Sequence, residues 1–373
     1  MERAPDAALK GERPLDLITM SSYPIADFYA QVLSPAQQPL VSVITPVYNG
    51  EDFLAECIES VLAQTYQNWD YTIVNNRSTD RTLEIAKSYA AKDSRIRVHD
   101  NRDFLPIIQN HNHAIRQISA QSKYCKVVLA DDWLFPECLM KMVTLAEAHP
   151  GVGLVGAYGL HGDGMHVMWR GLPFPKTVVT GREVSRLRLL QGRYVFGAPT
   201  ATLVRGDFVR KERNFYDESN LHADSTVCFR ILQKSDFGFV HQLLTFTRIQ
   251  GESNTTFSER MNSIQLSFLT ELIQYGPTCL DKREYEDRLQ VRLREYYQVL
   301  AEGLLQMRGR NYLEFHKNWL RNLGIPLRWS RLFSGFSRAL WNGVSHPIAA
   351  FKSLTRWWGK ARAPKKTRAG ARA

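Results

Sequence analysis

Two adjacent carboxylates follow an apolar run in the first half of the chain. Asp131 and Asp132 follow residues 124–129 after a single alanine, and they precede the aromatic segment 133–136. Adjacent carboxylates at the end of a strand are costly to hold together unless a cation or hydrogen-bond donors neutralise them. A hard divalent ion with oxygen ligands, bridging a diphosphate, would supply that neutralisation. The alternative is structural, because Asp132 could instead be the N-cap of an apolar helix.

A third carboxylate, Asp224, lies just before the apolar run 227–232. One interpretation is a helix cap, and the other is a general base that removes a proton from a reacting hydroxyl. His222 is a rival base, although a lone histidine is more often structural. His111 and His113 are not predicted to form a metal site, because residues i and i+2 point to different faces of a helix.

Strand-like and helix-like segments alternate around the first two carboxylates. Strands are predicted at 40–45, 70–74, 96–98 and 124–129, and helices at 53–62, 83–89 and 107–118. This alternation predicts an α/β domain with a mostly parallel sheet flanked by helices. Ligands bind beyond the carboxyl ends of the strands in such sheets. Polar loops at 45–49, 75–80 and 131–132 fall at those ends, although three ordinary turns would give the same pattern.

The 373 residues exceed the length of a typical single domain. We expect an N-terminal extension at 1–38, a main α/β domain at 39–257, a helical region at 258–325 and a basic, aromatic-rich tail at 326–373. The tail holds 11 Lys and Arg and no Asp or Glu, so it accounts for the whole net charge of +11. Because the rest of the chain is neutral and no recognition motif is present, we expect no specific nucleic-acid partner.

The cysteines indicate the compartment. They are five in number and scattered, with no CxxC pair, which is typical of reduced thiols in a cytoplasmic protein. The first 20 residues lack the apolar core of a secretory signal, and no run of about 18 apolar residues predicts a spanning helix. We therefore expect a cytoplasmic protein.

Four short motifs occur in a fixed order along the main domain. Residues 41–49 read VSVITPVYN, 58–68 read IESVLAQTYQN, 75–80 read NNRSTD and 130–132 read ADD. In order and spacing these motifs resemble the family 2 glycosyltransferases, over about residues 39–250. The resemblance implies a GT-A (Rossmann-like) fold, to which the helical region and the tail are a C-terminal extension.

The resemblance also implies an activity. A sugar would pass, with inversion, from a nucleotide-diphosphate sugar to an acceptor hydroxyl, with a UDP-sugar as the favoured donor. The implied cofactor is a divalent metal ion, Mn²⁺ or Mg²⁺. The implied setting is cell-surface glycan synthesis, with a glycan or lipid-linked acceptor.

The nucleotide pocket is implied to involve the loops after the first two strands. Thr45 and Tyr48 would line it, with Tyr48 close to the base. Asn75 and Asn76 stand where the family usually has an Asp pair, the first of which accepts a hydrogen bond from the base. An amide oxygen at Asn75 can still accept that bond, but without charge.

The diphosphate and the metal are implied to lie near the acidic pair. Asp131 matches the second Asp of the family's DxD motif and would contact both metal and nucleotide, whereas Leu129 stands where the first Asp would be. Asp132 is the second candidate metal ligand. Arg248 lies in a segment that resembles the family's Arg-x-His, with Gln250 in place of His, and would approach the diphosphate.

The catalytic base is implied to be Asp224, which matches the second residue of the family's Glu-Asp motif. Ala223 replaces the Glu. These departures leave an alternative function open, in which the same fold is a non-catalytic module that binds a nucleotide-sugar or a partner.

The tail combines aromatic and basic residues. Trp329, Phe333, Phe336 and Leu340 recur at spacings of four, three and four, which places them along one helical face. A basic, aromatic, acid-free segment is typical of a helix that lies on an anionic membrane surface. We therefore expect 326–373 to hold the protein peripherally on the inner face of the cell membrane. The alternative is a helix docked on the protein, followed by a basic end.

Overall fold

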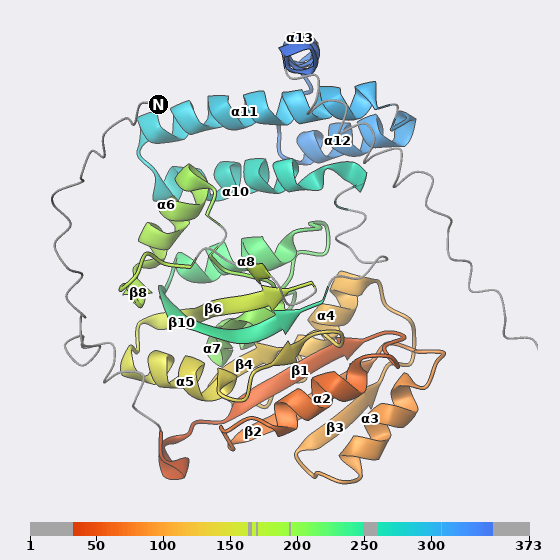
Figure 1. Ribbon diagram of the computed structural model, residues 1–373, viewed down its shortest axis with the longest axis vertical. Coiled ribbons are helices and arrows are strands. Elements are labelled where there is room, and N and C mark those ends of the chain that lie inside the picture. The colour runs from red at the N-terminus through yellow and green to blue at the C-terminus, as the bar shows by residue number, and fades with distance from the viewer. Residues whose placement is uncertain are drawn as a thin grey trace, which may run out of the picture.

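A mixed sheet forms the centre of the molecule (Figure 1). The computed structural model describes residues 33–162, 166–168, 171–193, 195–248, 258, 260–306 and 308–345. Within them the strand order is β3-β2-β1-β4-β9-β6-β10-β5, with β7 beside β6 and β8 beside β10.

The first half of the sheet is parallel. It contains β1 (Val41–Val47), β2 (Trp69–Asn75), β3 (Ile96–Asp100) and β4 (Tyr124–Val127), connected by α2 (Leu54–Leu62), α3 (Thr82–Ala90) and α4 (Ile107–Ile115), with a short 3-10 helix η2 (Pro35–Gln37) before them. Every residue of β1 is buried, as expected for an apolar strand covered on both faces. The predicted alternation of strands and helices is confirmed. The fourth strand ends two residues before the predicted end at 129, because residues 129–132 form a turn closed by Asp132 N–H donating to Leu129 O at 2.9 Å.

The second half of the sheet contains reversed strands. Its elements are β5 (Trp133–Leu134), α5 (Cys138–Ala148), β6 (Val152–His161), β7 (His166–Met168), β8 (Val178–Val179), α6 (Gly181–Gln191), η3 (Pro199–Ala201), β9 (Thr202–Arg205), α7 (Gly206–Arg210), α8 (Ala223–Leu232) and β10 (Asp236–Thr247). Strand β9 runs antiparallel to both β4 and β6, so β6 and its parallel neighbour β10 point the same way as β4. The long strands therefore share one direction, and the sheet is mostly parallel as predicted.

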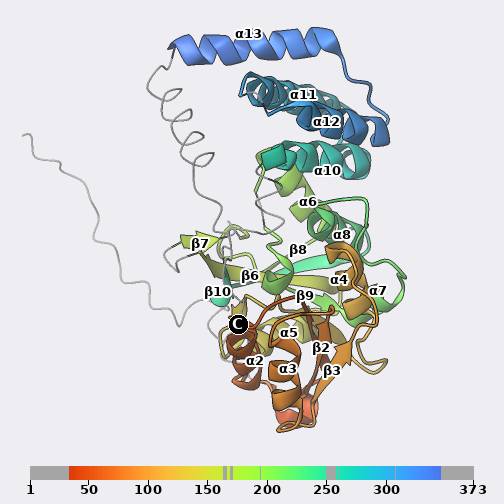
Figure 2. The ribbon, with the colours of Figure 1, turned by 90° about the vertical axis from the view of Figure 1, so that its right-hand side faces the viewer.

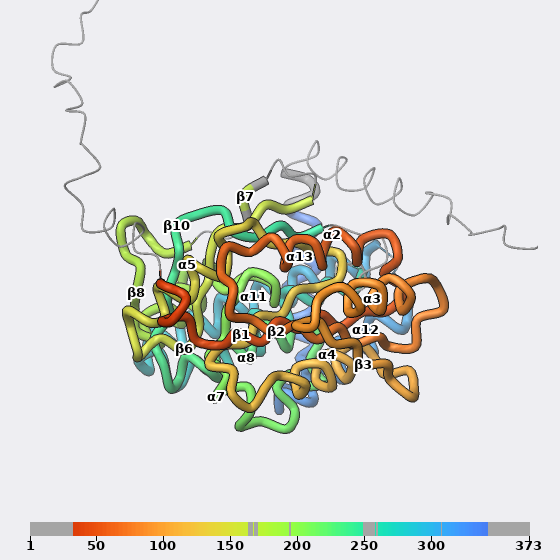
Figure 3. The backbone as a smooth tube through the Cα atoms, turned by 90° about the horizontal axis from the view of Figure 1, so that it is seen from below, coloured from red at the N-terminus to blue at the C-terminus, as the bar shows by residue number. Residues whose placement is uncertain are grey.

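Helices cover both faces of the sheet. Helices α2 and α5 lie on one side and α4 and α7 on the other, as the view from below shows (Figure 3). A separate cluster of buried apolar side chains fills each side. With both faces covered, the edge formed by the carboxyl ends of the long strands is where polar loops collect.

Four further helices stack beyond α6 and α8 (Figures 1 and 2). They are α10 (Ser263–Cys279), α11 (Lys282–Leu305), α12 (Arg310–Asn322) and α13 (Trp329–Ser345), and they enclose a third apolar cluster that includes Tyr296, Tyr297 and Leu300. The predicted helical region thus consists of real helices packed on the α/β domain. Among the described residues, no helix combines the length and apolarity needed to cross a bilayer.

A buried ion pair joins the helical region to the α/β domain. Arg188 on α6 donates from Nε and Nη2 to the carboxylate of Glu271 on α10, at 2.9 and 3.0 Å. The two side chains are only 3% and 2% exposed. Ser225 of α8 and Ser267 also donate to Glu271 Oε1, at 2.7 and 3.0 Å. Glu271 therefore holds three helices together, including the helix that carries Asp224.

Replacing Glu271 by Leu should destabilise the protein by about 3–5 kcal/mol, because it removes the carboxylate that accepts two hydrogen bonds from the buried Arg188 guanidinium. Chemical denaturation of the purified protein measures this loss. The double variant Arg188→Leu/Glu271→Leu should recover much of it, since the pair is then replaced by apolar side chains. A double variant no more stable than Glu271→Leu alone would show that packing, rather than the broken ion pair, causes the loss.

Candidate active site

The loops after β1 and β2 are joined by hydrogen bonds at the carboxyl edge of the sheet. Asn49 Oδ1 accepts from Thr79 N at 2.8 Å, and Gly50 N donates to Thr82 Oγ1 at 2.8 Å. Asp80 accepts from both Glu51 N and Thr82 N, at 3.1 and 3.0 Å. Asp80 thus satisfies the N–H of Thr82, the first residue of α3, as a cap would, and also binds the loop before α2. These bonds bring two of the predicted polar loops together.

Thr45 and Tyr48 differ in their access to a ligand. Thr45 is fully buried, and its hydroxyl donates to Val128 O at 2.8 Å and lies 2.8 Å from the Tyr71 hydroxyl. These contacts tie β1 to its neighbours and keep the Thr45 side chain away from the edge. Tyr48 is 50% exposed and meets Phe104 edge-on, with ring centroids 5.0 Å apart. Tyr48 and Phe104 therefore form an exposed aromatic pair on which a flat ring could stack.

The amides of Asn75 and Asn76 are both engaged. Asn75 Nδ2 donates to Asp100 Oδ1 at 2.7 Å, which orients the amide. Asn76 makes two bonds with the backbone of Leu105: its Nδ2 donates to Leu105 O at 2.8 Å, and its Oδ1 accepts from Leu105 N at 2.9 Å. Asn101 Nδ2 also donates to Asn76 Oδ1 at 3.0 Å. An aspartate at 76 could accept these bonds but not donate one, so the structure requires an amide there.

Replacing Asn76 by Asp should loosen the loop that carries Phe104. The carboxylate would face the Leu105 carbonyl oxygen without a proton to donate, at a cost of about 1–3 kcal/mol. Thermal unfolding above pH 6, where the carboxylate is charged, measures the effect. Because Asp100 is exposed, Asp100→Asn serves as a control and should leave the unfolding temperature nearly unchanged. An Asn76→Asp protein as stable as wild type would mean that the loop does not depend on this amide.

Asp132 is held by structural hydrogen bonds. It is 2% exposed, accepts from the Thr200 hydroxyl at 2.6 Å through Oδ2, and accepts from Arg248 N at 3.0 Å through Oδ1. Burial and the nearby charge of Asp131 raise its pKa to about 7. The helix-cap interpretation is wrong, because α5 begins only at Cys138. Each oxygen accepts one hydrogen bond, so Asp132 supports the turn, and its role as a metal ligand stays a prediction.

Asp131 is placed differently. It is half-buried in the turn between β4 and β5, and burial raises its pKa while the Arg248 guanidinium opposes that shift. Its own backbone N–H contacts the carboxylate, and among the described residues no group of three or more His, Cys, Asp or Glu gathers as a ready metal site. A divalent ion bound through one carboxylate, substrate phosphates and water fits this arrangement. Asp131 is therefore the candidate ligand.

Arg248 lies beside the acidic turn, directly after β10. Its Nε donates to Asp131 O at 3.1 Å and its Nη2 to Glu56 Oε2 at 2.5 Å. The guanidinium also lies 4.4 Å from the ring centroid of Phe53. The structure thus brings Asp131, Asp132 and Arg248 together, with Arg248 held by an ion pair. Gln250, its expected neighbour, lies outside the described residues.

Asp224 comes from a different element, the first turn of α8. Burial raises its pKa, and the charge of nearby His222 opposes that shift. Burial lowers the pKa of His222, whose Nε2 lies 2.9 Å from Ser263 Oγ on α10. A buried carboxylate with a raised pKa is a stronger base than a free one, which suits proton removal from a hydroxyl. His222 is instead anchored to the helical region.

Two residues that support the acidic turn were missed from the sequence. Thr200 accepts from Leu129 N at 3.1 Å and donates to Asp132, and the fully buried Lys126 donates from Nζ to Thr200 O at 2.7 Å. A lysine inside an apolar strand is a signal that a buried partner exists, because an unpaired buried ammonium is very costly. Nothing in the sequence pointed to Thr200.

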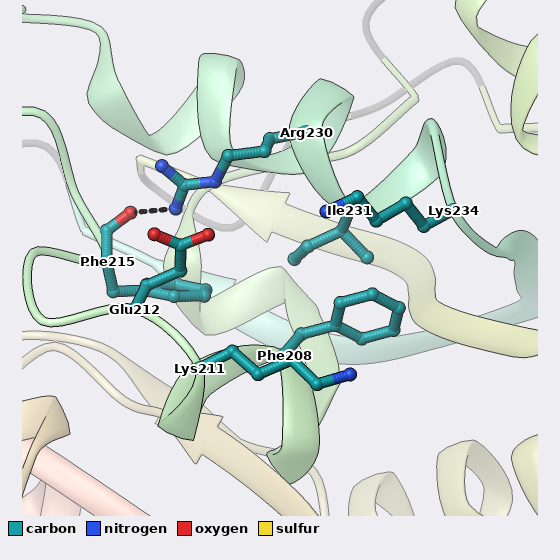
Figure 4. Close-up of a pocket in the computed structure, with 7 residues that line it drawn as sticks. All are labelled: Phe208, Lys211, Glu212, Phe215, Arg230, Ile231 and Lys234. Atoms are coloured by element: carbon teal, nitrogen blue, oxygen red, sulfur yellow. Dashed lines mark hydrogen bonds between the residues drawn. The ribbon is translucent and has the colours of Figure 1, made fainter.

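A small hollow lies elsewhere on the molecule (Figure 4). It is lined by residues of the 208–215 segment and by Arg230, Ile231 and Lys234 at the C-terminal end of α8. Asp224 is at the opposite end of this helix, which is about 15 Å long at 1.5 Å per residue. The hollow is therefore separate from Asp224.

The comparisons with known proteins agree with this architecture. Residues 42–212 match the family model described as Glycosyl transferase family 2. Over 169 residues the chain is 36% identical to EpsE of Bacillus subtilis (strain 168), to which glycosyltransferase activity is ascribed, and the match covers 41% of this chain and 60% of EpsE. Asp224 and Arg248 lie beyond the segment that matches the family model.

Two solved structures share the fold. TarS residues 1–349 of S. aureus, in complex with UDP-GlcNAc, superpose with a TM-score of 0.54 at 19% identity, covering 75% of this chain and 78% of that 1–349 fragment. The mannosyltransferase PcManGT from Pyrobaculum calidifontis, in complex with GDP-Man and Mn²⁺, gives 0.50 at 14% identity, covering 86% and 95%. Sequence identities this low support a shared fold and nothing further. Residues 42–212 are therefore a glycosyl transferase family 2 segment, set in a GT-A-like sheet.

Proposed function

We propose that this chain is an inverting, metal-dependent glycosyltransferase that moves a sugar from a nucleotide-diphosphate sugar to an acceptor hydroxyl. The observation that carries the proposal is the acidic turn at the carboxyl edge of the sheet. There Asp132, Thr200 and Arg248 hold the backbone, while the Asp131 carboxylate is left for a ligand. An edge of this kind is where α/β sheets bind their ligands.

The proposed reaction is a single displacement at the anomeric carbon. A bond forms from the acceptor oxygen as the bond to the diphosphate oxygen breaks, and the diphosphate leaves with that electron pair. Asp224 takes the acceptor proton, a role favoured by its raised pKa. A divalent ion, Mn²⁺ or Mg²⁺, would neutralise the leaving diphosphate when bound. Asp131 would hold that ion, and Arg248 lies close enough to its turn to add positive charge.

The favoured donor is a UDP-sugar. Asn75 Nδ2 donates to Asp100, and Asn75 Oδ1 accepts only a long hydrogen bond, 3.4 Å, from Ser78 N. A second lone pair on Oδ1 could accept from a base, which suits the N3–H of uracil rather than the bare N3 of cytosine. The exposed Tyr48–Phe104 pair lies at the same edge and offers a surface for the base. TarS was solved with UDP-GlcNAc and PcManGT with GDP-Man, so nucleotide-sugars are the ligand class of two structural neighbours.

The proposed acceptor is a glycan or a lipid-linked glycan in cell-surface polysaccharide synthesis, made on the cytoplasmic side of the membrane. The support is the likeness to EpsE, together with the basic, aromatic segment after residue 326.

A donor screen tests the proposal. The purified chain is mixed with UDP-, dTDP- and GDP-sugars, with and without Mn²⁺, and both its unfolding temperature and the release of nucleoside diphosphate are followed. A UDP-sugar should raise the unfolding temperature and yield UDP only when the ion is present. Binding without any release would favour the non-catalytic alternative, and no binding of any donor would reject both.

A further inference from the structure

Helix α13 packs on α11 through one face. Leu332 is 1% exposed, and Phe336 packs against the same apolar cluster. Gly335 faces the α11 backbone so closely that an added Cβ would lie 2.4 Å from Tyr297 O. Arg328 N donates to the Tyr297 hydroxyl at 2.8 Å just before the helix starts. The docked-helix alternative from the sequence is therefore correct for α13.

The other face of α13 is apolar and exposed. Trp329, Phe333, Leu340 and Trp341 are 58%, 66%, 59% and 72% exposed. Trp329, Phe333 and Leu340 lie along one side of the helix, because spacings of four and seven return to the same face. Of the four residues predicted to share a face, only Phe336 turns toward α11. Docking on the protein thus orders the helix and leaves an aromatic surface outside.

This surface lies at one end of the molecule. Figure 2 shows α13 across the outside of α11 and α12, at the opposite end of the long axis from β3 and α3. A planar surface could therefore contact α13 without first contacting the α/β sheet.

The charge around this surface selects its partner. Of the 11 Lys and Arg in 326–373, Arg328, Arg331 and Arg338 flank or lie within α13, and there is no acidic residue in the whole segment. A second copy docked face to face would bring these same positive charges together, so self-association is disfavoured. An anionic partner with an apolar interior matches both the charge and the aromatic face. Nucleic acid would supply negative charge but no apolar environment for the Leu340 side chain.

We propose that α13 lies at the headgroup level of an anionic lipid bilayer, with Trp329, Phe333, Leu340 and Trp341 inserted and the basic residues contacting lipid headgroups. Tryptophan favours this depth, and interfacial helices bind through buried apolar area together with attraction to anionic lipids. The proposal does not depend on the glycosyltransferase activity. If both hold, the enzyme works at the surface where a lipid-linked acceptor resides.

Vesicle co-sedimentation of the full chain tests the proposal. Wild-type protein should bind phosphatidylcholine vesicles that contain phosphatidylglycerol, bind weakly to pure phosphatidylcholine, and be released by salt. The triple variant Trp329→Ser/Phe333→Ser/Trp341→Ser should bind at least tenfold more weakly. Arg328→Gln should weaken binding by about fivefold, the contribution of one basic residue near the surface.

A matched control removes exposed apolar side chains from other helices. Ile264→Ser/Leu305→Ser alters residues that are each 48% exposed on α10 and α11, and it should bind vesicles like wild type. Unfolding temperature and nucleotide-sugar binding of the triple variant should match wild type, since its changes lie on the exposed face.

Equal vesicle binding by the triple variant and wild type would overturn the proposal. So would a dimer that dissociates in the triple variant without any vesicle binding, which would assign the face to a second copy. Retention on DNA that is lost in the triple variant, again without vesicle binding, would assign it to nucleic acid. Quenching of tryptophan fluorescence by brominated lipid should fall in Trp329→Phe/Trp341→Phe, which reports insertion rather than surface attraction.

Discussion

Turnover should fall by on the order of 10²-fold or more when Asp224 is replaced by Asn, the loss expected when a general base is removed. The amide keeps the shape of the side chain but cannot take the proton from the attacking hydroxyl. Nucleotide binding should be retained, because the proposed nucleotide site is at the Asp131 turn and the Tyr48 loop rather than on α8. Steady-state release of nucleoside diphosphate, together with titration of the donor, separates the two effects.

The pH dependence gives a second readout for Asp224. Only the ionised carboxylate accepts a proton, so wild-type turnover should rise with pH through the raised pKa of this group. Folding raises the pKa of Asp224, so the folded state binds the carboxyl proton more tightly than the unfolded state does. The stabilisation from this proton is therefore fully present below the pKa of an unfolded Asp, and it is lost as pH rises through the pKa of the folded state. The stability of Asp224→Asn relative to wild type should therefore increase with pH.

The control for this variant is Asp217→Asn, which changes an exposed carboxylate shortly before α8. Its amide keeps the oxygen that accepts from Ser219 N and Oγ. It should turn over like wild type. Near-normal turnover in Asp224→Asn would show that another residue takes the proton.

Replacing Asp131 by Ala should abolish the dependence on a divalent ion and lower turnover by on the order of 10²-fold, since neutralising the leaving group contributes several kcal/mol and each 1.36 kcal/mol is tenfold. Affinity for UDP should become independent of Mn²⁺. Wild-type activity should be lost in excess chelator and restored by Mn²⁺. Calorimetric titration with UDP, with and without Mn²⁺, measures the change in UDP affinity.

Glu137→Ala is the matched control, because it removes an exposed carboxylate six residues further on, before α5. It should retain the metal dependence. Asp132→Ala is not a control, since it leaves the Thr200 hydroxyl and Arg248 N without their acceptor and should reduce stability. If wild-type turnover survives chelation, the metal role is wrong, and Arg248 becomes the group that neutralises the diphosphate.

Much of the fold could be predicted because its signals are local. The run Val41–Val47 is apolar and β-branched, and spacing alone distinguishes it from the amphipathic helix Leu54–Leu62 that follows. The acidic turn, the start of α8 and the aromatic residues of α13 could likewise be located from the chain. What these residues do was harder to predict, because their partners are distant in sequence.

The sequence by itself determined the α/β class, the family resemblance, the loops that meet at the sheet edge and the concentration of positive charge after residue 326. The hydrogen bonds of Asp132 depend on the tertiary structure, because Thr200 and Arg248 reach it from 68 and 116 residues away. The tertiary structure likewise decided that Asn76 must be an amide, since Leu105 lies opposite it. The spacing of the aromatic residues in α13 predicted that they share a face. Which side of the helix is exposed depended on the tertiary structure, because Gly335 packs against the backbone of Tyr297 in α11. Hydrophobic periodicity is a property of neighbours in sequence, whereas hydrogen-bond partners and helix contacts are properties of neighbours in space.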